Sequence, residues 1–182
     1  MNCKKWKITV TRRQNQFPRL TFRWQLRKKN VELSYRLATE ADLAEIVALL
    51  SDDPLGAERE NFQLPLPASY IQAFRLIASD KHQALTVVEF NAEIVATFQL
   101  SFIQYLTYQG GIRAQIEAVR VKADLRAKGI GKAIFQHAIQ AAKSKGAHVL
   151  QLTTDKKRPE AKRFYASLGF VDSHEGMKLH LT

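Results

Sequence analysis

The most informative part of this sequence is VRVKADLRAKGIGKA, residues 119–133. Its alternating valines end a β-strand pattern that begins near Ile112. The pattern Arg-x-x-Gly-x-Gly then leads from Arg126 directly into a segment with apolar residues at helical spacing, which predicts a helix over residues 130–145. We therefore expect a strand, a glycine-containing turn and a helix in direct succession.

This turn is suited to binding a pyrophosphate. Gly129 and Gly131 let the backbone turn tightly and expose successive N–H groups, and the helix start adds unpaired N–H donors and the positive end of its dipole. Arg126, Lys128 and Lys132 add positive charge. A P-loop is excluded because alanine follows Lys132, and a dinucleotide fingerprint because its third glycine is missing. A turn that binds nothing remains the alternative.

Strand and helix patterns precede and follow this glycine turn, and the order along the whole chain is β-α-α-β-β-β-α-β-α-β. A hairpin turn is expected at residues 91–92, a helix cap at 39–42, and a long loop at 52–67. The predicted strands are residues 32–38, 84–90, 93–102, 112–121, 149–153 and 177–181, and the predicted helices are 43–50, 69–77, 130–145 and 159–168. This order implies an α/β fold with a mixed sheet that helices cover.

Two motifs stand in suitable elements and at a suitable separation. They are RxxGxG at residues 126–131 and AxxFYxxLGF at residues 161–170. Together they resemble the GNAT superfamily of N-acetyltransferases, over about residues 31–182. The resemblance implies an α/β (α+β) fold with a mixed, mainly antiparallel sheet of about six to seven strands and about four helices. It also implies acetyl-CoA-dependent transfer of an acetyl group to a primary amine, by direct attack in a ternary complex.

The resemblance further assigns the binding of acetyl-CoA. Main-chain groups of Val119 and Val121 would pair with the pantetheine amides where their strand splays from its neighbour, and an N–H near Val119 would face the thioester oxygen. The N–H groups of the loop would hold the pyrophosphate. The implied cofactor-binding residues are Val119, Arg120, Val121, Arg126, Ala127, Lys128, Gly129, Ile130, Gly131 and Lys132.

Two side chains are candidates for proton transfer. Tyr165 matches the family's tyrosine, which protonates the departing thiolate, and a phenol pKa of about 10 lies above that of a thiol. Glu117 shares a face with Val119 and Val121 if the strand alternates regularly, and in several family members a glutamate in this strand deprotonates the amine. A packed aromatic ring and a structural carboxylate are the alternatives. Gln115 lies one step further along that face and could bind substrate.

The composition fits one globular domain and excludes several classes of protein. The 182 residues are 46% hydrophobic and 25% charged, and no apolar run is long enough to span a membrane. The single cysteine, Cys3, cannot form an internal disulfide, and the histidines lack metal-ligand spacing. We expect a cytoplasmic protein with no metal and no membrane partner.

The net charge of +11 is concentrated at the N-terminus. Residues 1–30 contain ten Lys/Arg and no Asp/Glu, whereas residues 31–182 are nearly neutral. We therefore divide the chain into a basic extension, 1–30, and a catalytic domain, 31–182. The extension could be flexible or loosely docked, a start codon assigned too early, or an arm for nucleic acid or a membrane surface.

The acceptor is expected to be an amine on a small molecule or a peptide. The acidic residues Asp52, Asp53, Glu58 and Glu60 of the long loop hint at a cationic amine. The alternative function is a non-catalytic module that senses acyl-CoA, or a nucleic-acid-associated module that uses the basic arm. The sequence does not favour nucleic acid as a partner, and it leaves a homodimer open.

Overall fold

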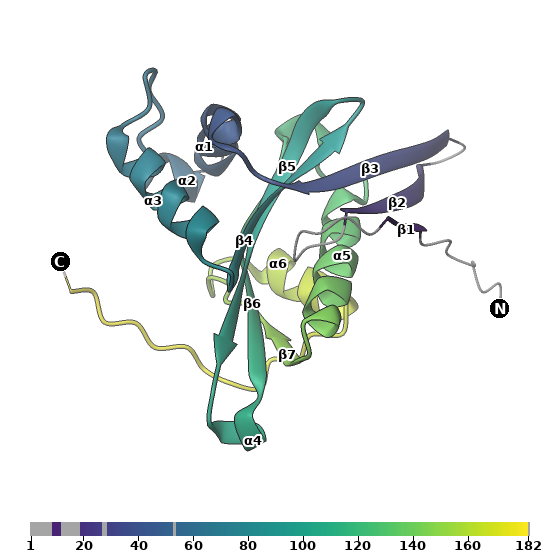
Figure 1. Cartoon of the computed structure of the whole chain (residues 1–182), viewed down its shortest axis with the longest axis vertical. Coiled ribbons are helices and arrows are strands. Elements are labelled where there is room, and N and C mark those ends of the chain that lie inside the picture. The colour runs from purple at the N-terminus through teal and green to yellow at the C-terminus, as the bar shows by residue number, and fades with distance from the viewer. Residues whose placement is uncertain (1–8, 12–18, 27–28, 53, 182) are drawn as a thin grey trace.

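A single sheet organises the protein, with its strands side by side in chain order (Figure 1). The structure is a computed structural model that describes residues 9–11, 19–26, 29–52 and 54–181. All neighbouring strands pair antiparallel except β6 and β7, which are parallel. The strands are β1 (Thr9–Thr11), β2 (Arg19–Leu26), β3 (Lys29–Leu37), β4 (Gln83–Phe90), β5 (Glu93–Gln104), β6 (Ile112–Val121) and β7 (Ala147–Gln151).

The predicted mixed, mainly antiparallel α/β fold is confirmed, but the strand count differs. From residue 29 onward the sheet has five strands, one fewer than predicted there, because residues 177–181 do not form a strand. β1 and β2 extend the sheet beyond β3, and β2 is in register with β3 from Thr21 to Leu26. Residues 1–8, 12–18 and 27–28 of the basic extension lie outside the described residues, and the division at residue 30 stays a prediction.

Helices cover both faces of the sheet (Figure 1). α5 and α6 lie on one face and α1, α2 and α3 lie on the other. Their bounds are α1 (Leu43–Ser51), α2 (Pro54–Ala57), α3 (Ala68–Ser79), α4 (Thr107–Gly110), α5 (Ile130–Ser144) and α6 (Pro159–Ser167). α2 interrupts the predicted long loop, and α4 is a turn between β5 and β6. No helix in the described part of the chain is long and apolar enough to cross a membrane.

The main core lies between the sheet and α5. The alternating apolar residues of β5 meet the apolar side of α5, where Phe98 and Ile134 are completely buried. Each such side chain stabilises the fold by about 1.5–3 kcal/mol through its removal from water. A smaller cluster of Ile46, Leu49, Val87 and Ile94 holds α1 on the opposite face. The core therefore fixes α5, and with it the glycine turn at its start.

Local sequence signals set the ends of several elements. Asn91 and Ala92 both have positive φ, which is the geometry of a tight hairpin turn between β4 and β5. Before α1, the N–H and the hydroxyl of Thr39 both donate to the carboxylate of Asp42, as the capping pattern predicts. The guanidinium of Arg36, hydrogen-bonded to the same carboxylate, lowers the pKa of Asp42 to about 2.

Candidate active site

β6 and β7 part halfway along β6. The two strands are paired only where Ile112–Gln115 lies beside β7. The rest of β6, residues 116–121, continues beyond the last paired position and leads to the glycine turn. This opening exposes one edge of β6, because a strand that loses its neighbour leaves main-chain N–H and C=O groups free to bind a ligand. The pairing ends at Gln115 because β7 itself ends at Gln151, and the splay that the resemblance implies stays a prediction.

A β-bulge interrupts β6 at the opening. Gln99 of β5 pairs with Glu117 and Thr97 pairs with Arg120, so that Ala118 and Val119 together stand opposite one residue of β5. Ala118 has φ of +52°, which a regular strand does not allow. The bulge turns the chain over, and the side chains beyond it change faces.

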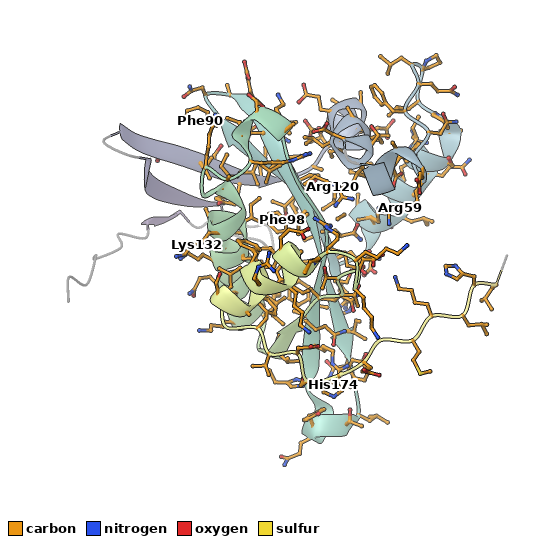
Figure 2. The ribbon with its side chains drawn as sticks, turned by 180° about the vertical axis from the view of Figure 1, so that it is seen from behind. Arg59, Phe90, Phe98, Arg120, Lys132 and His174 are labelled. Atoms are coloured by element: carbon orange, nitrogen blue, oxygen red, sulfur yellow. The ribbon has the colours of Figure 1, made fainter. Side chains whose placement is uncertain are left out.

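The bulge overturns one prediction about the site. Val119 and Val121 pack against the core beneath α5, whereas Glu117 is exposed and points to the opposite side. Glu117 instead shares a face with Arg120, which Figure 2 shows on the side of the helices α1–α3. Period-two alternation fails here because the extra residue shifts the register by one.

The glycine turn has the geometry of an anion cradle. Gly129 has φ of +89° and caps α5, and Ala127 also lies in the left-handed region at +59°. The first hydrogen bond within α5 runs from the N–H of Ala133 to the carbonyl of Gly129. The N–H groups of residues 130–132 precede it and point out of the helix start, where an anion can accept them. Lys132 is exposed at this end (Figure 2).

Arg126 makes contacts that the sequence did not predict. Its Nε donates to the carbonyl of Val121 at 3.0 Å, and its Nη2 donates to the carbonyl and to the carboxylate of Asp52 at 2.6 and 2.9 Å. Its main-chain N–H donates to the carbonyl of Ala123. The Arg126 side chain therefore holds the turn to the end of α1. The N–H donors available for a pyrophosphate are those of the residues that follow Arg126 in the chain.

Arg120 also uses its side chain within the opening. Its Nη1 donates to the carbonyl of Val119 at 3.0 Å. This carbonyl is one of the main-chain groups that the sequence assigns to the pantetheine arm. A ligand that pairs with Val119 must therefore displace the Arg120 guanidinium or share the carbonyl with it, since a carbonyl oxygen can accept two hydrogen bonds.

Tyr165 lies in an aromatic cluster next to the start of α5. Its half-buried ring is 5.4 Å from Phe135 and 5.5 Å from Phe164, between ring centroids. Burial raises the pKa of the Tyr165 phenol, and the charges of Arg158 and Arg120 oppose this shift in part. The phenol remains protonated at neutral pH and can donate its proton.

Glu117 ends a chain of hydrogen-bonded side chains across β6 and β7. The side-chain amide of Gln151 donates to the Oε1 of Gln115 at 2.7 Å, and the amide of Gln115 donates to the Oε1 of Glu117 at 2.7 Å. This chain fixes one carboxylate oxygen of Glu117 and leaves the other available. The sequence patterns made Gln115 and Glu117 candidates for substrate binding and proton transfer. They did not indicate Gln151, which lies 36 positions away from Gln115.

The predicted acceptor loop is attached to α3. The hydroxyl of Tyr70 donates to the carboxylate of Glu60 at 3.0 Å and accepts the N–H of Asn61 at 2.9 Å. These two bonds order part of the segment before α3. Of the predicted acidic set, Asp53 lies outside the described residues, and Asp52 is engaged by Arg126.

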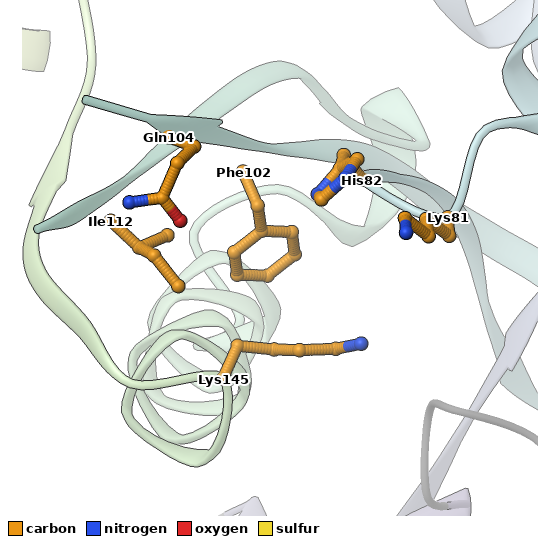
Figure 3. A pocket seen from close by; sticks show the side chains of 6 residues that line it. All are labelled: Lys81, His82, Phe102, Gln104, Ile112 and Lys145. Atoms are coloured by element: carbon orange, nitrogen blue, oxygen red, sulfur yellow. The ribbon is translucent and has the colours of Figure 1, made fainter. Parts of the chain in front are cut away.

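A separate recess lies at the opposite end of α5. Figure 3 shows Phe102 and Ile112 at its floor, with Lys145 at the end of the helix and the ammonium of Lys145 6.0 Å from the Phe102 ring centroid. Its volume is about 220 Å³, and Lys81, His82 and Gln104 complete the lining. Because the glycine turn stands at the other end of the helix, this recess is not part of the candidate active site.

Comparison with known proteins agrees with this geometry. Residues 43–170, most of the chain, match the model of the acetyltransferase (GNAT) family. The protein belongs to the GNAT family of acetyltransferases. The match includes the glycine turn, the bulged strand and the helix that carries Tyr165.

Three relatives illustrate this membership. Aminoalkylphosphonate N-acetyltransferase of Salmonella typhimurium is 31% identical over 84 residues, which cover 46% of this chain and 54% of that protein. The matched segment thus spans about half the length of this curated relative. A crystal structure of a transcriptional regulator from Bacillus halodurans is 50% identical with a TM-score of 0.79, covering 82% of this chain and 99% of that one. A Clostridium acetobutylicum protein crystallised with acetyl-CoA is 22% identical with a TM-score of 0.65, covering 82% and 96%, and it shares the fold.

Proposed function

We propose that this protein is an acetyl-CoA-dependent N-acetyltransferase that acts on a primary amine. The observation that carries the proposal is the opening between β6 and β7, which ends at the unpaired N–H groups of residues 130–132. An exposed strand edge suits the amides of a pantetheine arm, and a helix start suits a pyrophosphate. β6 leads through a short turn into α5, and we expect one CoA thioester to contact both features.

The chain's own residues would position acetyl-CoA along this path. The main chain of Val119, Arg120 and Val121 would pair with the pantetheine arm, and the turn from Ala127 to Lys132 would hold the pyrophosphate. Acetyl-CoA supplies an activated acetyl group as a thioester. A main-chain N–H at the bulge would donate to the thioester oxygen as negative charge develops there, which lowers the barrier to direct attack by the amine.

Two side chains would move the protons. Glu117 would accept a proton from the attacking ammonium or amine, directly or through water, with its carboxylate held by Gln115. Tyr165 would donate its phenolic proton to the sulfur as the thiolate leaves. The two groups stand on different elements: Glu117 is on β6, and Tyr165 is on α6.

The acceptor would be a polar amine whose other groups are positively charged or form hydrogen bonds. The face of the sheet that carries Glu117 also carries side-chain amides, and Gln99 donates to Gln83 at 2.8 Å on it. Glu60 and Glu58 lie on the segment before α3. The Salmonella relative acts, by its name, on aminoalkylphosphonates, so small polar amines come first in a screen.

Calorimetric titration with acetyl-CoA tests the binding step. In Gly129→Asp, a carboxylate would face the pyrophosphate, and we expect the affinity to fall at least tenfold, about 1.4 kcal/mol. Gly146→Asp is the matched control because Gly146 has a similar φ of +73° at the other end of α5, with open space around it. Equal binding by both variants would place the cofactor elsewhere. Thiol release from acetyl-CoA over a panel of amines tests the transfer.

A nucleic-acid-associated module is the second candidate. It is favoured by the ten cations in residues 1–30 and by the 50% identical protein described as a transcriptional regulator. Binding of DNA or RNA through these cations would weaken steeply with rising salt. A binding assay between about 50 and 200 mM salt, with and without residues 1–30, would separate this function from amine acetylation.

A further inference from the structure

β6 carries a third polar side chain on the same face of the sheet as Gln115 and Glu117. β6 pairs regularly with β5 up to Glu117, so Arg113, Gln115 and Glu117 alternate onto one face, which we call the acceptor face. The residues between them, Ala114 and Ile116, are buried on the opposite face, in the core beneath α5. Arg113 therefore belongs to the same surface as the two polar residues of the candidate active site.

The end of the acceptor face that carries Arg113 is accessible. α1, α2 and α3 lie beside one end of β5 and β6, and the α4 turn lies at the other end (Figure 1). Ile103 of β5 and Val149 of β7 stand opposite Arg113 on either side, and they are 36% and 39% exposed. A molecule that reaches Glu117 can therefore extend along the acceptor face as far as Arg113.

The guanidinium of Arg113 is partly enclosed by protein. Its Cζ lies 4.8 Å from the centre of the Tyr105 ring, and its Nε is buried without a hydrogen-bond acceptor. The other two nitrogens, Nη1 and Nη2, are not enclosed in this way. Because one side of the guanidinium faces protein instead of water, its attraction to an anion at Nη1 and Nη2 is less screened than that of a fully exposed arginine.

Arg113 also differs from other arginines of this protein in its partners. The guanidinium groups of Arg36, Arg75, Arg126 and Arg158 each pair with a carboxylate of the chain. Within the described part of the chain, Arg113 forms no ion pair. Placing a cation in a partly buried position costs free energy when no anion accompanies it. An anion from outside the chain would offset this cost.

We propose that Arg113 binds an acidic group of the acceptor, a carboxylate or a phosphonate, while the amine of the same acceptor lies at Glu117. The inference rests on the proposed function, and it narrows the acceptors to amines that also carry an anion. A guanidinium donates two parallel hydrogen bonds to such a group. The Tyr105 ring would hold the guanidinium in place, and Ile103 and Val149 would contact the carbon atoms next to the acid.

The spacing along β6 sets the length of such an acceptor. Arg113 and Glu117 are four residues apart, so their Cα atoms are about 13 Å apart in an extended strand. A hydrogen bond of about 3 Å at each end leaves about 7 Å between the amine and the acid, and the lean of Arg113 toward Tyr105 lengthens this distance. Three bonds of an extended chain span about 3.3–3.6 Å. We therefore expect the acid to lie about six to eight bonds from the amine.

A series of amino acids with a terminal amine tests both the acid and the spacing. Thiol release from acetyl-CoA is measured with 3-aminopropanoate, 6-aminohexanoate and 8-aminooctanoate, and with the uncharged amides of the two longer acids. The better of the two longer acids should have a kcat/KM at least tenfold above that of its own amide. It should exceed 3-aminopropanoate by a similar factor, because the short acid cannot reach Arg113 and Glu117 together.

Substitution of Arg113 tests whether this residue carries the preference. In Arg113→Gln, the ratio of kcat/KM between acid and amide should fall at least tenfold, and Arg113→Lys should keep part of it. Arg75→Gln is the matched control because Arg75 is already paired with Glu40, and it should keep the full ratio. Since each ratio compares two acceptors on one enzyme, a loss of folded protein lowers both rates and leaves the ratio unchanged.

Two results would overturn the inference: equal kcat/KM for acid and amide in the unchanged protein, or a preference that Arg113→Gln retains. A lack of thiol release with every amine would instead contradict the proposed function. Calorimetric titration of the protein with the two longer acids and their amides, in the presence of CoA, then decides the inference. The acids should bind at least tenfold more tightly than the amides, and Arg113→Gln should remove the difference. Equal binding of acid and amide, or no binding of either, would overturn it.

Discussion

Arg126 holds Asp52 through two acceptors at once, the carbonyl at 2.6 Å and the carboxylate at 2.9 Å. These residues lie 74 positions apart, and their contact joins the glycine turn to the end of α1. The turn faces the proposed pyrophosphate site, and α1 leads into the segment that would contact the acceptor. The contact therefore links the two halves of the candidate active site.

Loosening this contact should weaken substrate binding more than folding. The Arg126 and Asp52 side chains are 46% and 44% exposed, so Arg126→Gln should change the free energy of unfolding by less than about 1 kcal/mol. The KM for acetyl-CoA should rise several-fold, because the glycine turn loses the hydrogen bonds that hold it to Asp52. The control is Arg75→Gln on α3, which removes an exposed ion pair between Arg75 and Glu40. This variant should leave the KM for acetyl-CoA unchanged. Equal KM values in both variants would contradict the coupling.

The hydrogen bond from Gln115 to Glu117 should matter for turnover. Gln115→Ala removes the donor that holds the carboxylate, and we expect kcat to fall by about fivefold to tenfold with little change in the KM for acetyl-CoA. If Gln115 acts through Glu117, the double variant with Glu117→Gln should be no slower than Glu117→Gln alone. Gln104→Ala, in the recess at the other end of β5, is the control. Additive losses would assign Gln115 a separate role.

Local signals predicted the parts of the fold that depend on neighbouring residues. The glycine turn into α5 and the capping box of Thr39 and Asp42 depend on contiguous sequence, and the structure contains both; the capping box starts a short 3-10 turn that leads into α1. The bulge at Ala118 was not predictable in this way, because alanine has no preference for its left-handed φ. The tertiary fold imposes that conformation, and the face of Glu117 follows from it.

Contacts between distant segments account for the rest. Asp52 and Gln151 are ordinary polar residues in the sequence, and only the folded chain brings them to Arg126 and Gln115. Residues 177–181 have the pattern of a strand, but a strand forms only where an edge is within reach. The strand predicted there is wrong, because alternation alone does not supply the neighbouring strand with which it would have to pair.

Burial of His137 should make the protein less stable in mild acid. Desolvation lowers the pKa of His137 to about 4 from its ordinary value of 6.5, and the ring stacks on Tyr35 at 4.1 Å. The unfolded chain then binds a proton that the folded chain does not, so stability is full above pH 6.5 and is lost as the pH falls toward 4. Between pH 7 and 5 the loss is about 2 kcal/mol.

Urea unfolding at pH 7 and pH 5 checks this dependence. His137→Phe keeps a ring between Tyr35 and Phe98 but cannot bind a proton, so the difference between the two pH values should shrink by about 2 kcal/mol. His148→Gln removes an exposed histidine and should leave the difference as it is in the unchanged protein. A difference that is the same in all three proteins would show that His137 does not carry the effect.

Tyr165→Phe should separate chemistry from binding. The substitution keeps the ring that packs on Phe135 and removes only the hydroxyl, so folding and acetyl-CoA affinity should survive. Turnover should fall by about 10²-fold or more, the scale for losing one positioned acid. The loss should appear in kcat rather than in KM, because the proton is needed as the thiolate leaves. Phe164→Leu, which disturbs the neighbouring ring but keeps the phenol, is the packing control.

A Tyr165→Phe enzyme with unchanged kcat from pH 6 to 9 would show that the phenol takes no part in the reaction. A phenol of raised pKa remains protonated over most of this range, so its proton is available to the sulfur throughout.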